Sequence, residues 1–245
     1  MVLLLLFLAA LWAGTQNALA GGGSFITLPA LMLTGMDARA ANITSCIALF
    51  PGQTTTGLAG RDYVTGAESL SFRALFAISL VGGALGAVLL LVTPPVFFAR
   101  LVPWLVLFAT AVFAWGSFRP QTGASPKLGR LSAGAAQFMI AIYGGYFGGG
   151  IGFLMLAALT AAGLAIRNAG ATKNALAAVM NASAVAIFVF SREVHWLQAA
   201  VVCAGAMLGG ATGALMLKRV NEAALRGFVI LIGVALTIGL FVKAP

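Results

Sequence analysis

Apolar runs long enough to cross a membrane recur along the whole chain, and they constrain its fold more than any other feature. Hydrophobic residues make up 61% of the 245 residues and charged residues only 8%, whereas an ordinary soluble domain has about 25% charged residues. An α-helix needs roughly 20 apolar residues to cross a bilayer. Six runs come close to that length, at residues 40–58, 74–93, 101–117, 170–190, 196–217 and 227–243. The sequence therefore predicts an all-α integral membrane protein.

Two further apolar segments do not fit a single straight span. Residues 1–35 and 131–163 are each too long for one span and too short for two, and glycines interrupt both. A glycine-broken hairpin that returns to the membrane face it entered from would fit this length. We therefore expect each of these segments to form a re-entrant hairpin.

The two halves of the chain are related by an internal repeat. When the sequence is shifted by 128 residues, ten of the 24 positions in 21–44 are identical to those in 149–172, where roughly two or three would match by chance. We divide the chain into a first membrane repeat (1–117), a polar linker (118–130) and a second membrane repeat (131–245). A leader peptide cleaved after Ala20 is disfavoured, because a leader has no reason to recur in mid-chain and this N-terminus has no basic residues.

The distribution of basic residues favours inverted halves. With two re-entrant hairpins and six full spans, ten Lys and Arg residues fall on one side and four on the other, as the positive-inside tendency requires. The four are Arg39, Arg100, Arg192 and Lys243. Eight simple spans in parallel repeats are the alternative, and they divide the same residues seven against seven. We favour three spans plus a hairpin per half, with both termini outside.

The glycine breaks are candidate anion sites. A helix that begins at mid-membrane has backbone N–H groups without intrahelical partners and a partial positive charge at that end. Glycines leave these amides open to a ligand. The candidate residues are Gly22, Gly23, Ser24, Gly150, Ile151 and Gly152. Two alternatives remain open: Ser24 caps its own helix, or the glycines serve only for close helix packing.

Polar residues in the following spans extend the candidate site. Gln53 and Asn181 coincide under the 128-residue shift, and their amides are able to donate to an oxyanion without adding charge. Thr54 and Ser183 are beside them. The alternative for this pair is a hydrogen bond that only joins two helices. Lys173, near the start of its span, either attracts an anion or extends to the membrane interface.

Other classes of protein find little support. The acidic residues and the single histidine fall in or next to loops, so no acid, base or nucleophile cluster indicates an enzyme. The 14 Lys and Arg residues lie singly between apolar runs, which argues against nucleic-acid binding. Two cysteines, Cys46 and Cys203, form no metal-binding or disulfide pattern. We expect no metal and no cofactor.

The repeated motifs resemble those of a known family. Each half opens with a glycine-rich break and a short apolar helix, followed by a Gly-Leu/Met-Xaa-Xaa-Arg turn, in "AGGGSFITLPALMLTGMDARAANITS" and "FGGGIGFLMLAALTAAGLAIRNAGATKN". This pattern is similar to the sulfite exporter TauE/SafE family of membrane permeases. The resemblance implies transport of small sulfur-containing anions or organosulfonates, of the sulfite, thiosulfate and sulfoacetate class, across the inner membrane of a bacterium. It further suggests that Cys46 contacts the ligand, although its repeat partner is Asn174.

These observations combine into one functional prediction. We expect a secondary transporter that holds the anion between two half-helix N-termini at mid-membrane and moves one half against the other. A passive anion channel and a non-transporting membrane scaffold are the rivals. Helix faces rich in small residues make a homodimer a further expectation.

Overall fold

The protein is almost entirely helical. The computed structural model describes residues 1–19, 22–67, 70–118, 128–216 and 222–243. Over these ranges it has ten α-helices, one 3₁₀ turn at Arg61–Tyr63 and no strand beyond one isolated bridge. The helices are α1 (Val2–Leu19), α2 (Ser24–Met32), α3 (Ala38–Ala59), α4 (Phe72–Val92), α5 (Pro95–Phe118), α6 (Arg130–Tyr146), α7 (Ile151–Ala161), α8 (Ile166–Phe188), α9 (Trp196–Met216) and α10 (Glu222–Lys243).

Each of the six predicted spans is one long helix. Helices α3, α4, α5, α8, α9 and α10 contain 21 to 24 residues, which gives roughly 32 to 36 Å at about 1.5 Å per residue, enough for a bilayer core of about 30 Å. Among the described residues, three stretches are both long and apolar enough to cross a membrane: Phe72–Val92, Pro95–Trp115 and Arg167–Phe188. The prediction of an all-α membrane protein is confirmed.

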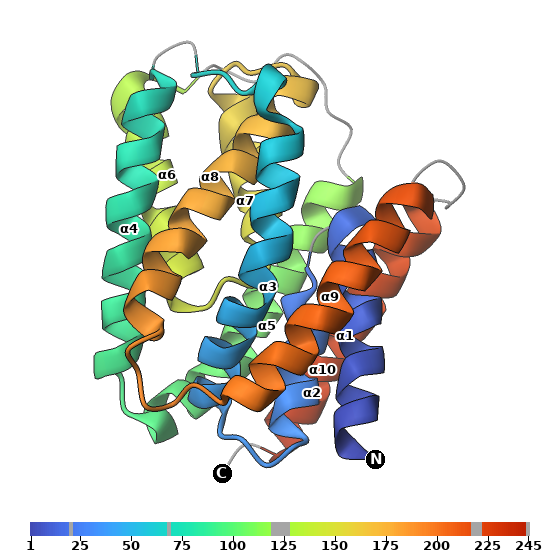
Figure 1. The fold of residues 1–245 in the computed structure, drawn as a ribbon. Coiled ribbons are helices and arrows are strands. Elements are labelled where there is room, and N and C mark those ends of the chain that lie inside the picture. The colour runs from blue at the N-terminus through green and yellow to red at the C-terminus, as the bar shows by residue number, and fades with distance from the viewer. Residues whose placement is uncertain (20–21, 68–69, 119–127, 217–221, 244–245) are drawn as a thin grey trace.

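The two segments that are too long for one span each form a pair of shorter helices. Helices α1 and α2 follow one another across the first glycine break, and α6 and α7 across the second. In Figure 1 the α1–α2 pair begins and ends at the lower end of the molecule, and the α6–α7 pair at the upper end. The four long helices nearest these breaks run in opposite directions in the two halves: α3 rises and α8 descends, while α4 descends and α9 rises.

The repeat is visible in the backbone. Gly22 and Gly150 have φ of 81° and 74°, and Gly35 and Gly163 have φ of 95° and 96°; each pair is separated by 128 residues. Residues other than glycine rarely adopt this left-handed conformation. The same chain reversals therefore begin and end the half-helices α2 and α7 in both repeats.

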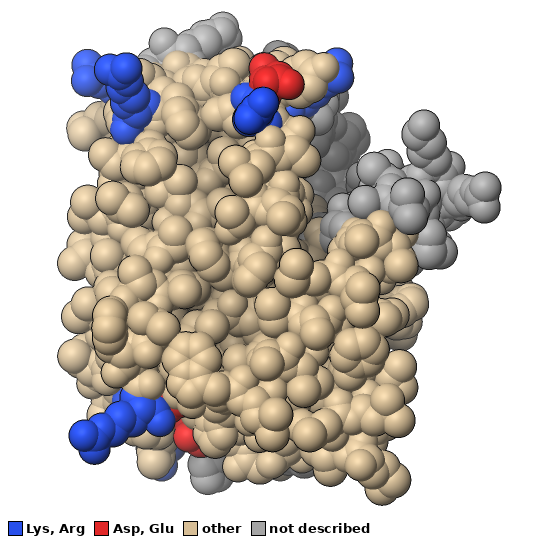
Figure 2. All heavy atoms as spheres, in the orientation of Figure 1, with Lys and Arg blue, Asp and Glu red and all other residues tan. Residues whose placement is uncertain are grey.

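Charged side chains lie at the two ends of the molecule. Figure 2 shows them at the top and bottom of the visible face, with an uncharged band between. The start of α3, which contains Arg39, and the α8–α9 connection, which contains Arg192, lie at the lower end of Figure 1. The end of α3, followed by the 3₁₀ turn with Arg61, and the starts of α4 and α6, with Arg73 and Arg130, lie at the upper end. This is the distribution that a membrane-embedded middle requires.

The halves interleave instead of packing side by side. Helix α1 packs mainly against α9, and α4 mainly against α6 and α8. Close approach at glycine makes these contacts possible: a Cβ on Gly86 of α4 would lie 2.1 Å from the carbonyl oxygen of Ile142, and one on Gly209 of α9 would lie 1.9 Å from that of Leu11. For these later glycine runs, close helix packing is therefore the correct interpretation.

An ion pair joins the two halves at the lower end. The guanidinium of Arg39 donates to both carboxylate oxygens of Glu193 and to the backbone oxygens of Leu91 and Thr93. The Arg39 side chain is 13% exposed and that of Glu193 is 27% exposed. The start of α3, the end of α4 and the α8–α9 connection are thus tied together.

Some predictions fall outside the described residues. These include most of the linker, at residues 119–127, and the repeated Gly21 with the neighbouring Ala20. Helices α1–α5 precede the predicted linker in the chain, and helices α6–α10 follow it.

Candidate functional site

A polar cavity lies between the two glycine breaks. The volume open to the centres of water molecules is about 80 Å³, several times the ~10–15 Å³ that one water needs by this measure. Its described lining comes from α1, α2 and α3 of the first half and from α7, α8 and the break before α7 in the second. These residues are Asn17, Gly22, Ser24, Gln53, Thr56, Gly148, Gly150, Ile151, Gly152, Phe153, Lys173, Asn174 and Ala177.

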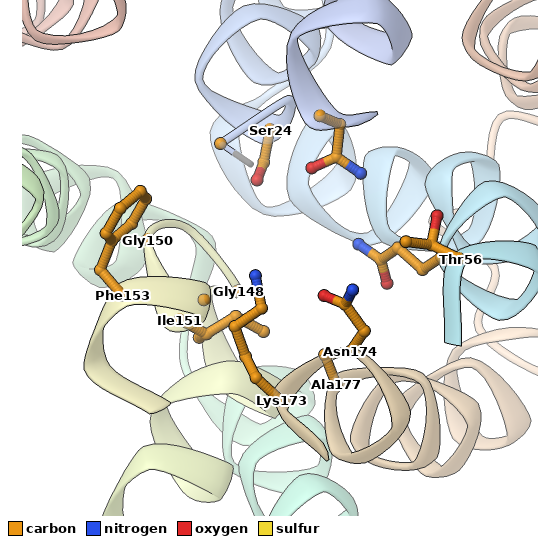
Figure 3. A pocket seen from close by; sticks show the side chains of 13 residues that line it. Ser24, Thr56, Gly148, Gly150, Ile151, Phe153, Lys173, Asn174 and Ala177 are labelled. Atoms are coloured by element: carbon orange, nitrogen blue, oxygen red, sulfur yellow. The ribbon is translucent and has the colours of Figure 1, made fainter. Parts of the chain in front are cut away.

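The second half supplies the start of α7 and a lysine. Gly150 precedes the helix in a left-handed conformation, and no side chain caps the helix start. Lys173 and Asn174 point from α8 toward the middle of the cavity (Figure 3). A Cβ on Gly152 would lie 3.6 Å from Lys173 Nζ. The ammonium and the first turn of α7 therefore face the same small space, and Lys173 lies in the cavity instead of extending to the interface.

The first half supplies the start of α2. Gly23 precedes the helix, and no side chain caps it in the manner of an N-cap, so the proposal that Ser24 caps its own helix is not what the structure shows. The side chain of Ser24 lies across the cavity from Lys173 (Figure 3). Asn17 Oδ1, from the last turn of α1, accepts a long hydrogen bond of 3.4 Å from the Gly23 amide.

The two predicted amide side chains, Gln53 and Asn181, are hydrogen-bonded to each other. Asn181 Nδ2 donates to Gln53 Oε1, and this bond links α8 to α3. Cys46 is within 3.9 Å of Asn181 Oδ1. Of the two amides only Gln53 is among the described residues lining the cavity. Its Nε2 group is therefore the donor of the pair that remains available to a ligand.

Thr54 and Ser183 bond to their own helices. Thr54 Oγ1 donates to the Phe50 carbonyl at 3.0 Å, and Ser183 Oγ to the Met180 carbonyl at 2.8 Å. Neither residue is among those described as lining the cavity. The structure thus brings most of the predicted binding residues together, but it separates these two from them.

Three polar lining residues were missed by the sequence analysis. Asn17 has Gly145 as its repeat partner and Asn174 has Cys46, so a search for matching polar pairs passes over both. Thr56 lies three residues after Gln53 on α3, which places both on one helix face. That spacing is a signal the sequence does contain.

The described lining of the cavity includes a basic residue and no acidic residue. In the described part of the chain, no group of three or more His, Cys, Asp or Glu gathers to bind a metal ion. Asp37 caps α3 and Glu193 pairs with Arg39, so both are used elsewhere. An ammonium, exposed backbone amides and neutral amide side chains form a set of donors suited to an anion with oxygen acceptors.

Long apolar helices around a polar cavity indicate a multi-pass membrane protein, of the class that includes transporters and channels. The sequence matches the sulfite exporter TauE/SafE family over residues 6–240, and the chain belongs to that family. This confirms the resemblance noted from the glycine motifs and makes the protein a membrane transporter.

Three curated relatives cover nearly the whole chain. A "Probable membrane transporter protein" from Haemophilus influenzae is 28% identical over 96% of this chain and 93% of its own length. The "Probable membrane transporter protein ORF9" from a Sinorhizobium species is 28% identical, over 98% and 92%. "Probable membrane transporter protein YfcA" from Escherichia coli K12 is 27% identical, over 95% and 87%. No solved structure matches the chain significantly.

Proposed function

We propose that the protein is a secondary transporter of small sulfur-containing anions or organosulfonates, of the sulfite, thiosulfate and sulfoacetate class. The observation that carries this proposal is a cavity bounded by the starts of both half-helices, with Lys173 facing the first turn of α7. The anion accepts hydrogen bonds from the amides of Gly22 and Ser24, from those of Gly150–Gly152 and from Gln53, while the Gly23 amide donates to Asn17 Oδ1. Asn181 holds Gln53 in place.

We further propose that the two halves are inverted in the membrane. Supporting observations are the opposite directions of α3 and α8 and of α4 and α9 (Figure 1), and the hairpins that begin and end at opposite ends of the molecule. Helices α4 and α6 begin at the upper end of Figure 1, and Arg73 and Arg130 belong to their first turns, with Arg61 in the turn after α3. The positive-inside tendency assigns this end to the cytoplasm. In a bacterium the membrane concerned is the inner membrane.

Alternating access requires two groups of helices that move relative to one another, and in this fold each group contains helices from both halves. Because α1 packs on α9 and α4 packs on α6, movement of residues 1–117 as one body against 131–245 would break the closest contacts in the protein. Two interleaved bundles, one around α1, α2 and α9 and the other around α4, α6 and α7, are able to move relative to one another without this loss. The cavity lies between them.

The homodimer remains a prediction, with less support than the sequence offered. The glycine faces that suggested it, at Gly82, Gly83, Gly86 and Gly209, approach other helices of the same chain. They are therefore already used within the chain.

Ligand-dependent thermal stability tests the proposed function. The purified protein in detergent is titrated with sulfite, thiosulfate, sulfoacetate, taurine, sulfate, acetate and chloride at constant ionic strength. A ligand at 100 times its dissociation constant stabilises the folded state by roughly 2.7 kcal/mol. Stabilisation by a sulfur anion and not by chloride supports the proposal.

Flux in proteoliposomes then separates the rival functions. A carrier gives saturable uptake that is accelerated by unlabelled ligand on the opposite side. A channel gives flux that neither saturates nor exchanges, and a scaffold gives no flux. Either of the latter two results contradicts the proposed mechanism.

A further inference from the structure

The repeat places two different residues at equivalent positions beside the cavity. Lys173 of α8 corresponds to Ser45 of α3 under the 128-residue shift. Lys173 lines the cavity, whereas Ser45 is 2% exposed and its hydroxyl lies 2.6 Å from that of Thr27. The lysine is therefore present in the second repeat only. The second half places a full positive charge beside the cavity, and the equivalent position of the first half does not.

We propose that the cavity selects anions with a single negative charge, and that Lys173 sets this preference. The inference rests on the proposed transport function and narrows its substrate class. It favours singly charged sulfonates and hydrogen sulfite over zwitterions such as taurine and over doubly charged anions, which at neutral pH include thiosulfate and sulfoacetate from the class named above.

The first reason is that one cation compensates one charge. Asp and Glu are absent from the described lining, and Lys173 has no acidic partner among the described ion pairs. A buried ion without a counter-charge is costly. A doubly charged ligand leaves one of its charges uncompensated at this depth, and a neutral ligand leaves the ammonium uncompensated.

The helix ends do not supply a second full charge. Each helix N-terminus provides about half an elementary charge, and its effect is small beside that of an ammonium group. At the start of α2 the Gly23 amide already has Asn17 Oδ1 as an acceptor. These groups orient the ligand's oxygens by hydrogen bonding, while Lys173 determines the net charge that is accepted.

The second reason concerns the charges that face the cavity. None of the described lining residues is acidic, so the ammonium of a zwitterion would have no carboxylate partner there and would be repelled by Lys173. Taurine should therefore bind weakly.

Ligands that share a tetrahedral sulfur centre but differ in net charge test whether the cavity selects a single negative charge. Methanesulfonate carries one charge, dimethyl sulfone is its neutral isostere, sulfate carries two charges and taurine is zwitterionic. Binding of each is measured by calorimetry on the wild type, on Lys173→Met and on Arg167→Met. The last variant is the matched control, because it removes one positive charge from the same helix at a position where the side chain contacts Tyr63 outside the cavity.

We expect ligand affinity to fall in Lys173→Met and to stay unchanged in Arg167→Met. Wild type should bind methanesulfonate at least about 30-fold more tightly than the other three ligands, the scale expected for a buried charge pair. Lys173→Met should lose roughly that factor and bind methanesulfonate and dimethyl sulfone equally. Arg167→Met should keep wild-type affinities. Because Lys173 has no described ion-pair partner, Lys173→Met should melt no lower than wild type without ligand.

Several results would overturn the inference. Wild-type sulfate binding as tight as that of methanesulfonate contradicts it, as does full methanesulfonate affinity in Lys173→Met. Acetate serves to separate this inference from the proposed function. Lys173-dependent acetate binding without binding of any sulfur anion would support the preference for a single negative charge and refute the proposed substrate class, whereas no binding of any single-charge anion to folded wild type refutes both.

Discussion

Gly152→Ala is the sharpest test of the cavity as an anion site. The glycine lies in the first turn of α7, and among the described residues the only atoms that a Cβ added there would meet within 4 Å belong to the Lys173 side chain, at 3.6 Å for Nζ and 3.7 Å for Cδ. The new methyl group would thus enter the space that an anion bonded to Lys173 must occupy. It would meet no backbone atom, so the helix itself need not move.

The expected magnitude follows from the hydrogen bonds at risk. An anion oxygen bonded to Lys173 would lie about 2.7 to 2.9 Å from the ammonium nitrogen, and the methyl group prevents the same anion from also reaching the α7 amides. Loss of one hydrogen bond to a charged group costs roughly 1.5 to 3 kcal/mol, which corresponds to a decrease in affinity of about 10- to 150-fold. Alanine stabilises a helix relative to glycine by up to about 1 kcal/mol, so stability without ligand should not fall.

The assay is ligand binding by calorimetry together with melting without ligand. Gly170→Ala is the matched control, because Gly170 is also helical, an added Cβ meets no atom of the described residues within 4 Å, and Gly170 is absent from the described lining. Unchanged ligand affinity in Gly152→Ala, in a protein with wild-type melting, would refute the role assigned to the start of α7.

Gly23 and Gly150 are less suitable positions for this test. A Cβ on Gly23 would lie 2.8 Å from the Ala13 carbonyl oxygen, and one on Gly150 would lie 2.9 Å from the Ala109 Cβ in a backbone with φ of 74°. Larger side chains at either position strain the fold, so a loss of binding there has two explanations. Only Gly152 separates ligand contact from folding.

Three further predictions concern stability and helix contacts. Arg39→Ala should lower the free energy of unfolding by about 1 to 3 kcal/mol, because it leaves the partly buried Glu193 without a partner. Loss of the exposed Arg61–Asp62 pair should have no measurable effect on that free energy. Thermal unfolding compares the two variants. Gly86→Ala should destabilise the α4–α6 contact, since its Cβ meets a backbone oxygen, while Gly239→Ala in open space should not; equal melting of the two variants would contradict this. A double-mutant cycle with Gln53→Met and Asn181→Leu should give a coupling of about 0.6 to 1.7 kcal/mol, and a coupling of zero would mean that the Asn181–Gln53 bond adds nothing to stability.

The helices were predictable because hydrophobic length alone determines them. All six apolar runs became single helices, and both glycine-broken segments became helix pairs. The start of α5 was missed by several residues, since the sequence analysis began that span at 101 while Pro95 is the first helical residue. Proline is well suited to the first turn of a helix, and this signal was overlooked.

Pairing of helices was not predictable in the same way. Lipid-facing and protein-facing residues are both apolar, so hydropathy does not distinguish them. The glycine runs around Gly86 and Gly209 indicated close contact, but not with which helix. Only the structure shows that α4 approaches α6 and that α9 approaches α1, which places each contact across the two halves.

The sequence identified cavity-lining residues where the repeat is symmetric, because matching glycines led directly to Gly22 and Gly150, whose backbone conformations agree. Where the repeat is not symmetric, it identified Lys173, a basic residue within a span, but not Asn17 or Asn174. These three residues have repeat partners of different chemistry, and all three contribute to the polarity of the cavity. A duplicated fold supplies two equivalent helix starts, so a ligand specificity that is not symmetric has to come from positions at which the two copies have diverged. The divergence between Lys173 and Ser45 is of this kind, because one copy faces the cavity with a charge while the other is buried against Thr27.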